Sequence, residues 1–296
     1  MDTVDVTHHR LTANGLDQHY VTAGQGPPVV LLHGFPEFWY AWRHQIPVLA
    51  QSYTVIAPDL RGYGYTEKPN TGYDKRTMAA DIRALMAALG HDRAAVIGHD
   101  RGARVGLRLA KDYPDFVERL AVLDNIPTRV LFETIDGPIA RGQWWFLFNA
   151  VPNLPEALIA GREEIWLRYF FTHWSHDPQL MTTDDIAEYV RAYQQPGAVM
   201  GACNDYRAGA EDVAQDTEDQ DVKLGCPVLA LWGADFEWVG RAYDVAAIWA
   251  DIAPDLRTVA IPDCWHLPQE ERPDEVNTYL LKFLAEARIS VATPAD

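Results

Sequence analysis

The stretch Ala94-Ala-Val-Ile-Gly-His-Asp100-Arg-Gly-Ala-Arg104-Val-Gly-Leu107 decides the fold. Residues 94–97 form a short apolar run that is typical of a buried parallel strand, and residues 101–111 have the apolar spacing of a helix. Between them lies Gly98-His-Asp-Arg-Gly102, the G-x-nucleophile-x-G pattern of a nucleophile elbow with aspartate at its centre. We therefore expect Asp100 to stand on a sharp turn, where the N-terminus of the following helix favours its negative charge.

Predicted strands alternate with predicted helices up to Asp124. Apolar runs typical of buried strands occupy residues 28–33, 53–58 and 120–124. They follow an antiparallel hairpin that is expected from Val4 to Gly24. Because strands joined by helices pair in parallel, the sequence predicts an α/β fold with a mostly parallel central sheet flanked by helices.

The alternation stops after Asp124, and strand patterns return only at Pro227. The intervening residues have helical spacing and many aromatic side chains, which predicts a helical cap inserted into the sheet domain. An acidic stretch, Glu211–Asp221, is expected to be a solvated linker at the end of this cap. The predicted division has three segments: the first part of the core (1–127), the helical cap or lid (128–217) and the second part of the core (218–296).

Composition excludes several classes of partner. A net charge of −17 over 296 residues argues against nucleic acid or an anionic membrane surface. The first 20 residues lack the apolar segment of a secretory signal, and no apolar run is long enough to span a membrane. Three scattered cysteines fit a reducing cytoplasm better than a disulfide framework, and no histidine spacing indicates a metal site. We therefore expect a cytoplasmic protein without a bound metal.

Two further residues complete a triad with Asp100. Asp124 follows a predicted strand and His266 follows the last one, in the chain order of α/β-hydrolase triads. A carboxylate can displace a leaving group from a saturated carbon and form an ester that water can hydrolyse, whereas serine would form a stable ether. Asp100 is thus the expected nucleophile, His266 the general base for ester hydrolysis and Asp124 its orienting acid. Asp235, in the loop after a later strand, is the alternative acid.

Backbone and side-chain donors are expected around Asp100. The loop Gly34-Phe35 follows a predicted strand, so the N–H groups of Phe35 and Arg101 are candidates for an oxyanion hole. Arg101 and Arg104 have helical spacing, so both guanidinium groups can face one cavity and bind a carboxylate. The alternative is that Arg104 pairs with an acidic residue at the surface.

The leaving group needs donors from the cap, because the cap is expected to close over Asp100. Indole and phenol groups suit a halide, and a phenol also suits an epoxide oxygen, which must be protonated. The candidates are Trp144, Trp145 and Tyr206. The alternative is that these aromatic side chains form the hydrophobic core of the cap.

Three stretches resemble the haloacetate (fluoroacetate) dehalogenases of the α/β-hydrolase superfamily: Gly98-His-Asp-Arg-Gly-Ala-Arg-Val105, Leu123-Asp-Asn-Ile-Pro-Thr128 and Asn204-Asp-Tyr-Arg-Ala-Gly-Ala210. The resemblance covers nearly the whole chain, cap included. It implies these site residues: nucleophile Asp100, triad partners Asp124 and His266, carboxylate-binding Arg101 and Arg104, and halide donor Tyr206. It also implies a short halogenated carboxylate as substrate, no cofactor or metal, and a homodimer.

Two stretches depart from that family. Trp144-Trp145 stands where the family has adjacent histidine and tryptophan, and losing the histidine disfavours fluoride release more than chloride or bromide release. His33-Gly-Phe-Pro-Glu-Phe-Trp-Tyr-Ala-Trp-Arg-His-Gln-Ile-Pro47 resembles the epoxide hydrolases, which share the aspartate elbow. Those relatives, and the haloalkane dehalogenases, usually carry tryptophan at the position of Arg101, which weighs against an epoxide or a neutral haloalkane.

The sequence therefore predicts hydrolysis of a short 2-haloacid, above all a haloacetate, to the 2-hydroxy acid and halide through an aspartyl ester. Epoxide hydrolysis by the same aspartate is the alternative among enzymes. A hydrolase-fold binding protein without turnover is the alternative from a different class.

Overall fold

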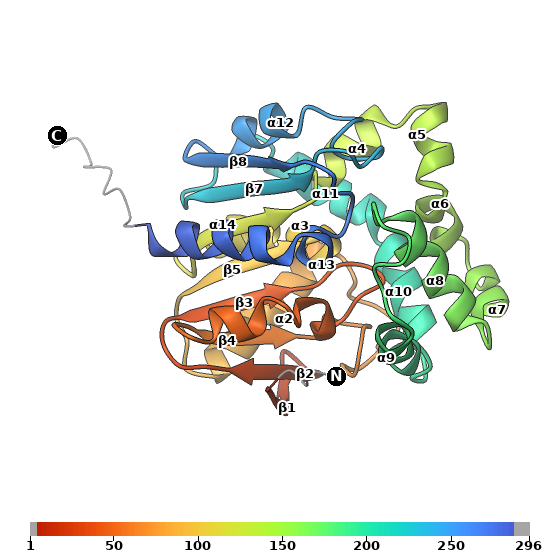
Figure 1. Ribbon diagram of the computed structural model, residues 1–296, viewed down its shortest axis with the longest axis horizontal. Helices are drawn as coiled ribbons and strands as arrows, with labels where there is room; N and C mark the ends of the chain where they lie inside the picture. Colours follow the sequence, from red (N-terminus) through yellow and green to blue (C-terminus); the bar gives the residue numbers. More distant parts are fainter. Residues whose placement is uncertain (1–4, 287–296) are drawn as a thin grey trace, which may run out of the picture.

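The computed structural model describes residues 5–286, and the strands among them form one eight-stranded sheet (Figure 1). The strands are β1 (Thr7–Ala13), β2 (Leu16–Ala23), β3 (Pro28–Leu32), β4 (Thr54–Pro58), β5 (Ala94–His99), β6 (Val117–Leu123), β7 (Val228–Gly233) and β8 (Leu256–Ile261). Their order across the sheet is β1-β2-β4-β3-β5-β6-β7-β8. The hairpin β1–β2 is antiparallel, as is the pair β2–β4, while the other neighbours are parallel. The predicted fold class is confirmed; Val4, the expected start of the hairpin, lies outside the described residues.

Helices cover both faces of the sheet. Every residue of β5 is buried, which requires packing on each side of this central strand. The helices of the core are η1 (Trp39–Trp42), α1 (Ile46–Leu49), α2 (Lys75–Ala88), α3 (Asp100–Asp112), α12 (Val245–Ile252), α13 (Pro268–Glu271) and α14 (Pro273–Ala285). Helix α2 packs against α3, and α1 packs against α14. Helix α3 packs against β5 and β6 and so covers the central strand that leads into it.

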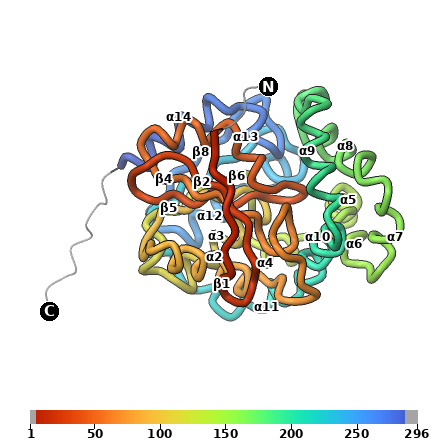
Figure 2. The backbone as a smooth tube through the Cα atoms, turned by 90° about the horizontal axis from the view of Figure 1, so that it is seen from below, coloured from red at the N-terminus to blue at the C-terminus, as the bar shows by residue number. Residues whose placement is uncertain are grey.

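The chain between β6 and β7 is described throughout and forms helices only. They are α4 (Thr128–Thr134), α5 (Gly137–Gly142), α6 (Trp144–Ala150), α7 (Leu154–Ile159), α8 (Glu163–His173), α9 (Thr183–Tyr193), α10 (Ala198–Arg207) and α11 (Gly209–Glu218). Helices α5 to α10 gather at one end of the sheet, on the right in Figures 1 and 2. Several of their aromatic residues, among them Trp145, Phe170 and Tyr206, belong to the same hydrophobic core as the sheet. We propose the division at 1–127, 128–217 and 218–296 on this basis.

The prediction of an acidic, solvated linker was wrong. Glu211–Asp221 is not a solvated connection, because most of it belongs to α11. Asp212 accepts a hydrogen bond from the backbone N–H of Lys75 at 2.8 Å, and the Gln215 side chain donates to Asp74 at 2.7 Å. Asp74 and Lys75 begin α2, whose free N–H groups attract negative charge. Asp212 and Gln215 thus dock α11 onto the start of α2.

Candidate active site

The nucleophile elbow forms at the junction of β5 and α3. Asp100 has a φ of 44°, in the left-handed region that is costly for a residue with a side chain. A Cβ on Gly98 would lie 2.5 Å from the carbonyl oxygen of Gly102, and a Cβ on Gly102 would lie 2.2 Å from that of Leu32. Only glycine fits at these two positions. The turn holds Asp100 at the N-terminus of α3, where the helix dipole favours a carboxylate.

The Asp100 side chain is buried and hydrogen-bonded. Its Oδ1 accepts from the backbone N–H of Phe35 at 3.0 Å. Burial raises the pKa of Asp100, but its electrostatic interactions with His266, His99 and Arg104 outweigh burial and hold this pKa below its ordinary value. The carboxylate is therefore ionised, which is the form that a nucleophile requires.

The structure brings His266 to Asp124 and Asp100. His266 Nδ1 lies 2.5 Å from Asp124 Oδ2, and His266 Nε2 lies 3.9 Å from Asp100 Oδ2. The other oxygen of Asp124 accepts from the backbone N–H of Gly233 at 3.1 Å. With Nδ1 donating to Asp124, Nε2 is left to accept a proton from a water near Asp100.

Asp235 has different partners. Its Oδ1 accepts from Arg241 at 2.8 Å, and its Oδ2 accepts from the backbone N–H of Asp263 at 2.9 Å. The side chain is 32% exposed, whereas that of Asp124 is fully buried. The geometry therefore assigns the histidine partner to Asp124.

The two arginines after Asp100 point to different places. Arg101 donates from Nε and Nη2 to the carboxylate of Asp205, at 3.0 and 2.6 Å. It does not line the cavity above Asp100, so the expected pair of guanidinium groups in one cavity is not formed. Asp205 is fully buried, and a buried carboxylate needs cationic partners, which Arg101 and Lys75 supply.

Arg104 does line the cavity with Asp100. Its Nη1 donates to Thr128 Oγ1 at 2.9 Å, and its buried Nε has no partner among the described residues. Burial lowers the pKa of Arg104, and the positive charge of Arg101 lowers it further, while Asp100 raises it. No acidic residue forms an ion pair with Arg104 within residues 5–286, so its charge is directed at the cavity.

The two tryptophans predicted as halide donors also point to different places. Trp145 is 6% exposed and lines the cavity with Asp100. Trp144 does not line it: its indole N–H donates to the Tyr169 hydroxyl at 3.2 Å. Consecutive residues of a helix point about 100° apart, so α6 can aim only one of the two indoles at Asp100. Trp144 is therefore corrected from a halide donor to part of the outer cap.

Tyr206 is not among the residues that line this cavity, but its ring meets that of the cavity-lining Phe146 edge to face, 5.0 Å away. Its ring is 5.1 Å from the Phe35 ring, edge to face, and the Arg101 guanidinium lies 4.5 Å above it. Among the described residues its hydroxyl has no hydrogen-bond partner. Burial raises the pKa of Tyr206, and the negative charge of Asp100 raises it further. The hydroxyl therefore stays protonated and can donate.

The sequence did not predict several cavity-lining residues, namely Asn125, Gln143, Phe146, Trp174, Phe236 and Trp238. Asn125 donates from its side chain to the Asp100 carbonyl at 3.0 Å. Phe236 stacks on the His266 ring at 4.9 Å, and Trp174 meets that ring edge-on at 4.8 Å. Asn125 and Phe236 follow β6 and β7, so their position at strand ends was a usable indication. No sequence pattern marks Trp174.

A buried ion pair supports the elbow from below. His99 Nδ1 lies 2.8 Å from Glu37 Oε2, and its Nε2 lies 2.7 Å from the backbone carbonyl oxygen of His266. Burial lowers the pKa of His99, but the charge of Glu37 raises it more, to about 9. The protonated ring donates to both partners and so fixes the backbone of His266.

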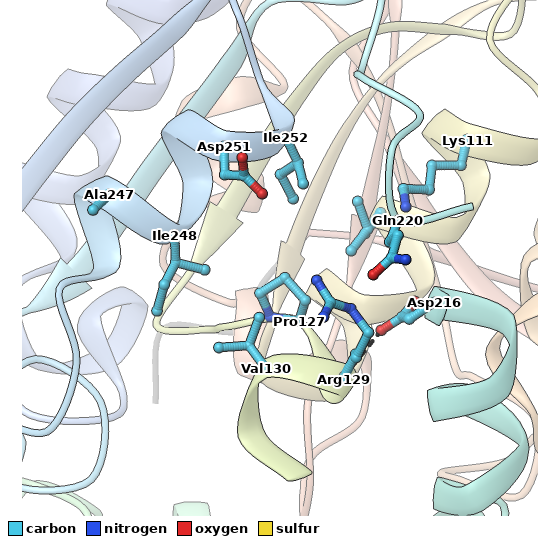
Figure 3. A pocket seen from close by; sticks show the side chains of 11 residues that line it. Lys111, Pro127, Arg129, Val130, Asp216, Gln220, Ala247, Ile248, Asp251 and Ile252 are labelled. Carbon is cyan, nitrogen blue, oxygen red and sulfur yellow. Dashed lines mark hydrogen bonds between the residues drawn. The ribbon is translucent and has the colours of Figure 1, made fainter. Parts of the chain in front are cut away.

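The cavity at Asp100 is small, at about 30 Å³. A second cavity, of about 330 Å³, lies between α3, α4, α11 and α12 (Figure 3). Its walls include Leu107, Val130 and Ile248, and none of the predicted site residues lines it. Within residues 5–286, no cluster of three or more histidine, cysteine or acidic side chains could hold a metal ion. The predicted triad residues Asp100, Asp124 and His266 all line the smaller cavity.

Comparison with known proteins agrees with this geometry. Residues 27–273 match the family described as alpha/beta hydrolase fold. The chain is 41% identical over 290 residues to a soluble epoxide hydrolase of Corynebacterium sp. (strain C12), covering 97% of this chain and 100% of that one. It is 36% identical over 284 residues to a fluoroacetate dehalogenase of Burkholderia sp., covering 92% and 91%. The solved epoxide hydrolase CorEH, without ligand, superimposes with a TM-score of 0.89 at 41% identity, over 95% of this chain and 99% of that one. The chain thus belongs to the alpha/beta hydrolase family, and it is a hydrolase of that superfamily.

Proposed function

We propose that this protein hydrolyses a short 2-haloacid, such as a haloacetate, to the 2-hydroxy acid and halide. The observation that carries the proposal is the pairing of an ionised, buried Asp100 with an unopposed Arg104 in one small cavity. An anionic substrate meets a negatively charged protein here, so a local cation is needed to bind its carboxylate. The 36% identical fluoroacetate dehalogenase supports the same substrate class.

The first step is displacement at the carbon that bears the halogen. Asp100 Oδ2 attacks this carbon, the carbon–halogen bond breaks, and the halide leaves with its electron pair. The proposed donors to the departing anion are the indole N–H of Trp145, which lines the cavity, and the protonated hydroxyl of Tyr206. The product of this step is an alkyl ester of Asp100.

The second step is hydrolysis of that ester. His266 Nε2 takes a proton from water, which attacks Cγ of Asp100, and Asp124 stabilises the imidazolium. The N–H of Phe35 already donates to Oδ1, where the negative charge of the tetrahedral intermediate develops. The N–H of Arg101, in the first turn of α3, is the proposed second donor. Collapse releases the 2-hydroxy acid, with the proton of His266 passing to the leaving oxygen.

Epoxide hydrolysis is the second candidate, favoured by the 41% identity to a soluble epoxide hydrolase over nearly the whole chain. It uses the same ester at Asp100 but needs an acid to protonate the epoxide oxygen. Tyr206 can be one such acid. The other donor near the cavity is the indole of Trp145, which suits a halide better because an indole N–H is a very weak acid.

The deciding experiment offers purified protein fluoroacetate, chloroacetate, bromoacetate and the small epoxide propylene oxide in parallel. We expect halide release from the haloacetates, with chloride and bromide faster than fluoride, and no diol from propylene oxide. The matched control is Asp100→Asn, analysed by mass spectrometry to exclude deamidation. Full turnover by Asp100→Asn contradicts the mechanism, and diol without halide transfers the proposal to epoxide hydrolysis.

We further propose a cytoplasmic homodimer that acts on a small molecule and needs no cofactor. Helices α6 to α8 expose several large apolar side chains, and burying them against a second copy would remove this surface from water: Leu147, Leu154, Leu158 and Ile165. Among the helices of the described chain, none has both the length and the apolar character that crossing a membrane requires. Light scattering on the purified protein tests the dimer directly.

A further inference from the structure

Three tryptophans stand between two cavities in this protein. The inner cavity, of about 30 Å³, contains Asp100 and His266, and an outer cavity of about 890 Å³ lies on the other side of the tryptophans. Trp145, Trp174 and Trp238 line both cavities. These three residues form the partition between the two spaces and are called the tryptophan wall below.

The outer cavity is aromatic and reaches the surface. Beyond the tryptophan wall, its lining includes Trp144, Tyr169 and Trp265. Exposed side chains at its edge, Arg141 and Glu237, place it in contact with solvent. A molecule that approaches Asp100 through the outer cavity must pass the tryptophan wall.

Trp238 differs from the other two residues of the wall. Trp145 and Trp174 are 6% and 3% exposed, with ring centres 4.9 Å apart, and Trp174 also contacts His266. Trp238 is only partly buried, lies in the loop between β7 and α12, and has no aromatic ring partner among the described residues. Its indole rests on the backbone of Gly142, where a Cβ would lie 1.9 Å from the ring.

The contact at Gly142 joins the core to the cap. Gly142 ends α5 in the cap, and the next residue, Gln143, donates from its side chain to the backbone carbonyl of Trp238 at 3.1 Å. The loop that carries Trp238 also carries Phe236, which stacks on His266. The position of Trp238 is therefore set by both parts of the molecule and is tied to the catalytic histidine.

We propose that Trp238 sets the upper size limit of the substrate by keeping aryl and branched apolar groups out of the inner cavity. The inference rests on the proposed function, whose ester chemistry at Asp100 it uses. A cavity of about 30 Å³ has room for about two water-sized groups, which suits a halomethyl group but not a phenyl ring. Without the indole of Trp238, the inner cavity opens into the outer one, whose aromatic side chains suit a phenyl substituent.

The test compares wild type, Trp238→Ala and Tyr169→Ala. Tyr169 is the matched control, because it is a large aromatic residue that lines only the outer cavity. Each protein is assayed with a small and a bulky substrate of both chemical classes: chloroacetate with α-chlorophenylacetate, and propylene oxide with styrene oxide. The quantity of interest is the ratio of kcat/KM for the bulky substrate to that for the small one.

We expect Trp238→Ala to raise this ratio by about tenfold or more, and Tyr169→Ala to leave it within about twofold. Trp238→Leu serves as a second variant and is expected to give an intermediate ratio. Thermal unfolding of each variant establishes that it is folded. An unchanged ratio in folded Trp238→Ala and Trp238→Leu overturns the proposal, as does an equal rise in Tyr169→Ala.

A binding measurement separates this inference from the proposed function. If wild type turns over neither chemical class, the proposed function fails, and the size limit is read from thermal shifts with acetate and phenylacetate. We then expect phenylacetate to stabilise Trp238→Ala but not wild type, with acetate acting equally on both. Equal stabilisation of both proteins by phenylacetate contradicts the size limit, whatever the activity.

Discussion

The core side of the site and its cap side obey different rules. On the core side, Asp100, Asp124 and His266 follow strands β5, β6 and β8, and parallel strands end at the same edge of the sheet. On the cap side, Trp144 and Trp145 occupy one short helix, yet only Trp145 reaches the cavity. The sheet fixes the proposed catalytic groups through the backbone, whereas the cap fixes its groups through the rotation and packing of individual helices.

The strongest test of the core side is Asp124→Asn, with Asp235→Asn as its matched control. We expect Asp124→Asn to lower turnover by about a thousandfold or more, because His266 loses the partner that orients its ring and stabilises its protonated form. The ester at Asp100 should accumulate, with one halide released per site, and mass spectrometry detects it. Asp235→Asn should retain nearly full activity; if the two variants exchanged these effects, the assignment of the acid would reverse.

Substituting Arg104 should affect substrate binding, whereas substituting Arg101 should affect stability. Arg104→Met should raise KM for chloroacetate by about a hundredfold while leaving Tm nearly unchanged, because its charge is directed at the cavity. Arg101→Met should lower the free energy of unfolding by about 3 kcal/mol or more, since it strips Asp205 of a buried partner. Steady-state kinetics and thermal unfolding on both variants check this. A KM effect confined to Arg101→Met would restore the carboxylate site to that residue.

On the cap side, Trp145→Phe and Trp144→Phe form a matched pair. Both remove one indole N–H from α6, but only Trp145 lines the cavity that contains Asp100. We expect Trp145→Phe to slow chloride release by about tenfold, the effect of losing one donor to a developing anion. Trp144→Phe should change it by less than about threefold. Rapid measurement of the first turnover gives the rate of halide release; equal effects would contradict the difference in orientation.

The smallest expected effect concerns the ion pair beneath the elbow. His99 has a pKa raised to about 9 from its ordinary 6.5, so its contribution to stability is complete below about pH 6.5 and is lost as the pH rises through about 9. Glu37→Gln removes the charge that raises this pKa. Wild type should therefore lose about 5 °C more in Tm than Glu37→Gln between pH 7 and pH 10. Parallel pH dependences of the two proteins would argue against a charged pair.

Sequence patterns predicted the parts of this molecule that depend on local backbone geometry. The elbow needs glycine at positions 98 and 102 because strand and helix pass so close together, and these glycines are visible in the sequence. The pairing of Arg101 with Asp205 could not be predicted, since it joins residues 104 positions apart and leaves no periodic trace. The prediction of a solvated linker at Glu211–Asp221 was wrong because the carboxylate of Asp212 binds the start of a helix that is distant in the sequence.

The position of the cavity was predictable from the sequence, but its size was not. The strand ends place the cavity above the elbow, whereas no sequence pattern predicted the tryptophan wall that bounds it. Trp238 meets Gly142 only because the cap folds back onto a loop of the core. Contacts of this kind depend on the arrangement of two segments, and neither segment carries a pattern that anticipates the other.

The hydrogen bond from Phe35 to Asp100 makes the two carboxylate oxygens inequivalent. Oδ1 is held by the backbone, and Oδ2 faces His266 at 3.9 Å. In the proposed reaction, Oδ2 departs with each product molecule and an oxygen atom from water takes its place. In heavy-oxygen water, the first product should therefore carry an ordinary oxygen and every later one a heavy oxygen. Each product thus takes its hydroxyl oxygen from the water molecule that was consumed in the preceding turnover.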